Sequence, residues 1–160
     1  MGRVAERAAA LARRNEERDE SNAAAVAVAS QRSDLVAIAE EILRKHAPRI
    51  EGLGDWRPDE VTVQRYASGS TGISSHRDGR RHAYLVAILT LEGSALLRQC
   101  SDRAGTTVGA WGAGAGSLVL LRGPGLGGIE DDRPLHAVDG PRGRRRTSLT
   151  LRATGSSLAA

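Results

Sequence analysis

The spacing of hydrophobic positions changes near residue 50, and this change divides the chain into two parts. In the first part, apolar residues recur every three or four positions, which is the spacing of one face of a helix. Ser33 or Asp34 can cap this predicted helix, and Pro48 ends it. The apolar face of the helix consists of Leu35, Ile38, Ala39, Ile42 and Leu43.

In the second part, short apolar or alternating segments are separated by glycine, proline and serine, a pattern that predicts strands and turns. We predict strands at 61–66, 85–91, from 96 onward, 117–121 and 146–152. The segment 101–116 is polar and rich in glycine, so we predict a long loop there. Many short strands behind a helical region are typical of an all-β barrel with a helical preface, and such a barrel can hold one small ligand.

Three regions follow from these patterns. Residues 1–52 form a helical N-terminal extension that is partly low in complexity, and residues 53–154 form the barrel. Residues 155–160 are a short tail of small residues that we expect to be disordered.

The last predicted strand has two different faces. Thr147, Leu149 and Leu151 alternate with a polar set, which carries an arginine at each end and hydroxyl groups between them. Such a polar face is either solvated or lines a cavity that holds an anion, because guanidinium groups bind carboxylates in a bidentate way. The polar set consists of Arg146, Ser148, Thr150 and Arg152.

His76, Arg77 and Asp78 form a second polar group. In an extended strand, His76 and Asp78 would point to the same side, as two of the three ligands of a facial metal site. His136 is the candidate third ligand, since two histidines and one carboxylate form the site of Fe(II) oxygenases. The alternative is a polar turn without a metal. The next polar residues, at 80–82, are predicted to be solvated in a loop.

Taken together, these motifs resemble those of the AlkB-like branch of the Fe(II)/2-oxoglutarate dioxygenases over residues 61–153. The matching elements are the Gln-Arg-Tyr triplet at 64–66, the His-x-Asp motif, the distal histidine and the arginine-flanked last strand. The resemblance implies a double-stranded β-helix (jelly-roll) barrel, with iron held by His76, Asp78 and His136. It implies that 2-oxoglutarate is held by Tyr66, Arg146 and Arg152, with Gln64 and Ser148 at positions where the family usually has asparagine.

The composition of the chain bears on where the protein is located and on which partners it can bind. The single cysteine, Cys100, excludes an internal disulfide and favours a reducing, cytoplasmic location. No apolar run is long enough to cross a membrane. The net charge of +4 is compatible with nucleic acid but does not require it, since the positive charge is almost all arginine. Few aromatic residues could stack on a base: the chain has no Phe, two Trp and two Tyr.

Three functions remain open at this point. The first is a 2-oxoglutarate oxygenase that hydroxylates something other than nucleic acid, and we favour it because aromatic stacking groups are few. The second is AlkB-type oxidative demethylation of alkylated nucleic acid, which the positive charge and the last strand would suit. The third is a non-catalytic binding barrel. The sequence names neither the substrate nor the oligomeric state.

Overall fold

The computed structural model describes residues 37, 40, 41, 43–45, 50, 53 and 56–154. The described positions before residue 46 are helical, in agreement with the helix predicted ahead of Pro48. The rest of the predicted N-terminal extension and the predicted tail lie outside the described residues. Within the described part, no helix is long and apolar enough to cross a membrane.

Strands make up most of the described chain after residue 59. In chain order they are β1 (Glu60–Tyr66), β2 (Gly72–His76), β3 (His82–Glu92), β4 (Ser94–Cys100), β5 (Thr107–Gly114), β6 (Leu118–Arg122), β7 (Leu135–Asp139) and β8 (Arg146–Thr154). A single 3₁₀ turn, η3 (Leu126–Gly128), lies between β6 and β7.

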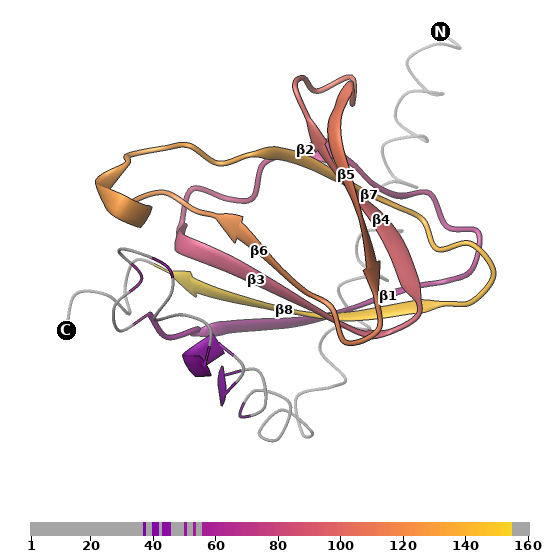
Figure 1. Cartoon of the computed structure of the whole chain (residues 1–160), viewed down its shortest axis with the longest axis horizontal. Coiled ribbons are helices and arrows are strands. Elements are labelled where there is room, and N and C mark those ends of the chain that lie inside the picture. The colour runs from indigo at the N-terminus through magenta and orange to yellow at the C-terminus, as the bar shows by residue number, and fades with distance from the viewer. Residues whose placement is uncertain are drawn as a thin grey trace, which may run out of the picture.

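The strands form two four-stranded antiparallel sheets (Figure 1). The first sheet has the order β1-β8-β3-β6, and the second has the order β2-β7-β4-β5. The chain crosses from one sheet to the other at every connection between successive strands except the β4–β5 hairpin. This pattern of crossings is the jelly-roll arrangement of two facing sheets. The predicted double-stranded β-helix fold is therefore confirmed.

Apolar side chains on the outer face of the first sheet pack against residues that precede β1. Alternate residues of β3 and β8 face this side, and each fully buried large side chain contributes about 1.5–3 kcal/mol through the hydrophobic effect. The described residues Leu43, Leu53 and Trp56 therefore bury part of this outer face. The buried members of this cluster are Leu43, Leu53, Trp56, Leu85, Ala87, Leu89, Leu126, Leu149, Leu151 and Ala153.

The inner face of the first sheet is polar where β1 and β8 pair. Their register places Tyr66 opposite Arg146 and Gln64 opposite Ser148. Towards the other end of the pair, the partners are threonines and then Glu60 with Arg152. An apolar cluster joins the two sheets beside this polar strip, so the interior of the barrel is half polar and half apolar. That cluster consists of Val86, Ala95, Leu97, Leu121 and Val138.

The prediction of a long loop at 101–116 is wrong, because β5 occupies residues 107–114 and pairs with β4 along its whole length. Glycine and alanine have low strand propensity, and this strand contains five of them. It forms because β4 offers a complete row of backbone partners in the hairpin. Only the turn between the two strands remains a loop.

His82 is also placed differently from the prediction, since it is buried rather than solvated. It is the first residue of β3, and its Nε2 accepts a hydrogen bond of 3.0 Å from Arg81 Nε. The same nitrogen lies 3.6 Å from a carboxylate oxygen of Glu60. The two arginines before His82 make the local sequence typical of a solvated loop. The contact with Glu60, which is distant in sequence, instead holds the imidazole in a buried position.

The buried His82 leads to a prediction about stability and pH. Burial, and after it the charge of Arg152, lowers the pKa of His82, while Glu60 and Asp78 oppose this and Arg81 adds to it. Since the folded pKa lies below the unfolded one, the stabilisation is present above the unfolded pKa and is lost as pH falls through the folded pKa. We expect the free energy of unfolding to fall as pH decreases from the unfolded pKa of about 6.5 towards the lower folded pKa. Urea unfolding of His82→Gln should show a weaker fall, and an unchanged pH dependence would contradict the assignment.

Candidate metal centre

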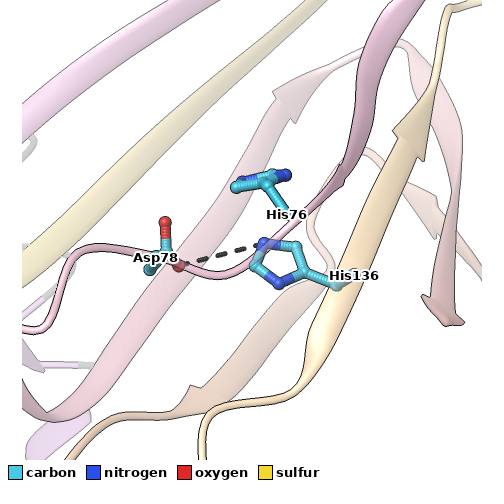
Figure 2. Close-up of side chains that lie close together, drawn as sticks. All are labelled: His76, Asp78 and His136. Carbon is cyan, nitrogen blue, oxygen red and sulfur yellow. Dashed lines mark ion pairs between the residues drawn. The ribbon is translucent and has the colours of Figure 1, made fainter. Parts of the chain in front are cut away.

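His76, Asp78 and His136 lie together at one end of the second sheet (Figure 2). His76 is the last residue of β2 and pairs directly with His136 of β7. Each residue offers one ligand atom, and these atoms all lie within 4.8 Å of one another. Strand β2 ends at His76, so the expectation that His76 and Asp78 share one extended strand is wrong. Asp78 reaches the two histidines from the loop that follows.

Backbone carbonyl groups orient both imidazole rings. Nδ1 of His76 lies 2.8 Å from the carbonyl oxygen of Ser74, and Nδ1 of His136 lies 3.2 Å from that of Pro134. When each Nδ1–H donates to its carbonyl, each Nε2 keeps a free lone pair. These lone pairs can then serve as metal ligands.

The surroundings of His136 favour its neutral form. Its Nε2 lies 3.9 Å from Asp78 Oδ2, and its ring centroid is 4.3 Å from that of His76. Burial, and after it the neighbouring His76, lowers the pKa of His136. A neutral imidazole is the form that coordinates a metal ion, so the site is prepared for one.

Arg133 holds the loop that carries Asp78. Its Nη1 donates to the backbone carbonyl of Asp78, and its Nε and Nη2 bind the carboxylate of Asp131 at 2.7 and 2.8 Å. Arg77, beside Asp78, donates in turn to the carbonyl of Arg133 at 2.9 Å. The sequence gives no local sign of this clamp, because Arg133 is 55 positions from Asp78 and follows an acidic run. The clamp ties the Asp78 loop to the segment that enters β7.

The three residues open onto a cavity between the two sheets. One wall comes from the first sheet, with its polar part on β1 and β8 and apolar residues on β3 and β6, and the opposite wall comes from β2, β7, β4 and β5. Of the residues predicted to bind the cofactor, all but Ser148 line this cavity. Ser148 is fully buried beside it and accepts a hydrogen bond of 3.3 Å from Arg146. The lining residues are Gln64, Tyr66, Ile73, His76, Asp78, Ile88, Leu97, Ala113, Val119, His136, Val138, Arg146, Thr150 and Arg152.

The two arginines of β8 differ in their partners. Arg152 donates to Glu60 at 2.9 Å and to Thr62 at 3.2 Å, so its charge is already matched by a carboxylate. Arg146 donates only to hydroxyl groups, those of Ser148 and Thr90. No acidic side chain in the described part of the chain forms an ion pair with Arg146. The expectation that both arginines share one anion therefore changes, and Arg146 is the arginine with an unmatched charge.

Arg146 is 3% exposed, and burial lowers its pKa because the interior disfavours a charged group. Besides the two hydroxyl groups, the ring of Tyr66 faces its charge, with the ring centroid 5.6 Å from the guanidinium carbon. Burial also raises the pKa of Tyr66, although Arg146 and Arg152 partly oppose this. A buried cation without a counter-ion is unfavourable, so this end of the cavity attracts an anion.

Unsatisfied polar atoms mark the same wall. Within the described residues, Arg146 Nε, Thr150 Oγ1 and Arg152 Nε are buried and lack a hydrogen-bond partner. All three belong to alternate residues on the inner face of β8. Buried polar groups in native proteins are almost always bonded, so these three atoms are available to water or to a polar ligand in the cavity.

No protein-family model matches the chain, and no curated protein matches it in sequence. Among solved structures, it is similar to an uncharacterized conserved protein with a double-stranded β-helix domain from Klebsiella pneumoniae subsp. pneumoniae. The two are 15% identical over 59% of this chain and 66% of that chain, with a TM-score of 0.43.

It is also similar to a Cupin 2 conserved barrel domain protein from Salinispora arenicola, with 20% identity over 62% of this chain and 66% of that one and a TM-score of 0.42. A hydroxypropylphosphonic acid epoxidase from S. wedmorenis matches at 14% identity over 58% and 42%, with a TM-score of 0.38. The chain spans less than two thirds of each of these three proteins. Likenesses of this size do not identify a function.

Proposed function

We propose that this chain is an Fe(II)/2-oxoglutarate-dependent dioxygenase that hydroxylates a substrate other than nucleic acid. The observation that supports this best is the buried guanidinium of Arg146, which has no counter-ion among the described residues and lines the same cavity as His76, Asp78 and His136. A metal site alone would fit many functions. A metal site with a separate anion site fits a co-substrate that carries a carboxylate at each end.

The donor set agrees with iron. Two neutral imidazoles and one carboxylate that leave coordination positions open are typical of non-haem Fe(II) oxygenases. When bound, Fe(II) would allow dioxygen to act as the oxidant: one oxygen atom would enter the hydroxylated product, and the other would enter the succinate that forms from 2-oxoglutarate with loss of carbon dioxide. His76, Asp78 and His136 would hold the metal ion.

The residues of β1 and β8 would hold and orient the co-substrate. Arg146 would bind its distal carboxylate through two N–H groups, and the Tyr66 hydroxyl can donate a further hydrogen bond. The apolar residues of the opposite wall would exclude water from the space between. Arg152 would act indirectly, since its ion pair with Glu60 fixes the end of the strand pair.

The proposal can be tested with Co(II) as a spectroscopic probe in place of iron. The wild-type protein should bind Co(II) stoichiometrically and show its visible absorption bands. Adding 2-oxoglutarate should change those bands, whereas adding propionate, which has a single carboxylate, should not. A protein that binds Co(II) but gives no response to 2-oxoglutarate would be a metal-binding barrel of another kind.

The clamp around Asp78 gives a further prediction. Arg133→Ala should weaken Co(II) binding by about 10- to 100-fold, as is typical for residues that orient metal ligands. Arg122→Ala is the matched control, because Arg122 pairs with Asp132 in the same segment at 3.4 Å without contacting Asp78. Equal Co(II) affinity in the two variants would show that Arg133 does not position Asp78.

A further inference from the structure

Trp111 is an exposed aromatic residue on the cavity side of the second sheet. It lies on β5, the edge strand, and pairs with Leu97 of β4. Leu97 lines the cavity, and so does Ala113, which is two residues from Trp111 on the same face of β5. The indole therefore projects to the cavity side, yet it is 53% exposed. A large apolar side chain in this position lies at the open mouth of the barrel.

The strand register relates Trp111 to the candidate metal centre. His76, His136, Gln99 and Gly109 are successive partners across β2, β7, β4 and β5. Neighbouring strands are about 4.8 Å apart, so Gly109 lies roughly 10 Å from His136. The indole of Trp111 covers Gly109, because a Cβ atom at Gly109 would lie 2.9 Å from the ring. The indole ring therefore offers a flat apolar surface roughly 10 Å from the metal ligands, about the length of a small molecule.

Gln99 lies between the metal ligands and this surface. It pairs with His136 on one side and with Gly109 on the other, so its side chain points to the same face as theirs. The residue is exposed, and its amide makes no hydrogen bond within the described residues. An amide can both donate and accept, and at this position it is available to a ligand that lies between the metal centre and the indole.

The surface formed by Gln99, Gly109 and Trp111 carries no charged side chain. Arg133, which holds the Asp78 loop, pairs with Asp131 at 2.7 Å. Arg98 alternates with Gln99 along β4, so it faces the other side of the sheet, where it pairs with Asp139 at 2.7 Å. Neither arginine is left to attract a phosphate backbone. A neutral small molecule suits this surface better than a polyanion.

We propose that Trp111 and Gln99 bind the substrate through a neutral planar aromatic ring, with the ring stacked on the indole and a polar substituent bonded to the amide. The proposal rests on the proposed function for the role of the neighbouring metal centre, but the binding surface itself does not depend on a bound metal. The substrate class is thus a small aromatic molecule with a polar group on its ring.

Nuclear magnetic resonance of the ¹⁵N-labelled protein can test this, with p-cresol as the probe. The chain has two tryptophans, so its spectrum contains two indole N–H signals, and the buried Trp56 serves as an internal reference. We expect p-cresol to shift the Trp111 signal and the Gln99 side-chain amide signals in a saturable way, while Trp56 does not move. 4-Methylcyclohexanol has the same size and hydroxyl group without the planar ring, and it should bind at least about tenfold more weakly, which corresponds to about 1.4 kcal/mol.

Substitutions at and near Trp111 distinguish stacking of the ligand on the indole ring from general apolar contact. Trp111→Ala should weaken p-cresol binding about tenfold, as followed by the Gln99 amide signals, and Trp111→Phe should restore most of the affinity. Leu96→Ala is the matched control, since Leu96 is 40% exposed on the adjacent strand and points to the other face. It should bind p-cresol like the wild type.

Several outcomes would overturn the proposal. These are equal binding of p-cresol and 4-methylcyclohexanol, unchanged binding in Trp111→Ala, or a preference for a short oligo(dA) over p-cresol. Sedimentation that shows a dimer dissociated by Trp111→Ala would assign the indole to a contact between copies of the chain instead. The Co(II) titration is independent of all these results, so failure of the aromatic surface and failure of the proposed function can be told apart.

Discussion

Replacing Arg146 with methionine is expected to weaken 2-oxoglutarate binding strongly while the barrel stays folded. The charged hydrogen bonds of such a guanidinium contribute about 1.5–3 kcal/mol, or roughly 10- to 150-fold in affinity. Arg146→Lys should lose much of the same affinity, because an ammonium cannot form the bidentate pair. Calorimetric titration of the Co(II)-loaded variants with 2-oxoglutarate measures both effects. Wild-type affinity in Arg146→Lys would contradict the proposed pairing.

Arg146→Met should also have a distinctive effect on the stability of the fold. Arg146 is buried without a counter-ion, so an apolar replacement of similar volume should leave the free energy of unfolding unchanged or raise it. Arg152→Met is the matched comparison on the same face of β8. It breaks the ion pair with Glu60 and should lower the free energy of unfolding by about 1–3 kcal/mol. The two variants should thus separate ligand binding from stability.

Replacing His136 with alanine is expected to abolish Co(II) and Fe(II) binding. Substitutions of residues that merely orient ligands cost about 10- to 100-fold in affinity, so loss of a ligand in a three-residue site should exceed about 100-fold. The β2–β7 pairing does not depend on the imidazole, so the fold should persist. His82→Gln serves as the control, because His82 is a buried histidine outside the cavity lining. Retained metal affinity in His136→Ala would exclude His136 from the site.

Local pattern was sufficient to predict much of the site. The alternation of residues 146–152 separates the side chains that pack on the outer face from those that face the cavity, because every strand residue turns to one side or the other. The spacing of His76 and Asp78 correctly indicates that they lie close together, although Asp78 reaches His76 from a loop. Residues near in sequence can be placed relative to one another in this way.

Long-range contacts explain what the sequence could not reveal. Arg146 and Arg152 look equivalent in the strand pattern, but Glu60, which pairs with Arg152 and not with Arg146, is 92 positions away from Arg152. The edge strand that carries Trp111 has too few large side chains to be recognised by propensity, so its indole could not be assigned to the mouth of the barrel. Arg133 likewise acquires its role only through the fold.

The most direct test of the proposed function is the formation of succinate from 2-oxoglutarate by the purified protein in air with added Fe(II). Many such enzymes turn over their co-substrate slowly without the primary substrate, so the measurement does not require that the substrate be known. We expect succinate to form only with Fe(II) present and to fall to the level of an iron-only blank in His136→Ala and in Arg146→Met. Succinate at the blank level with the wild-type protein, or equal amounts from the wild type and Arg146→Met, would contradict the proposal.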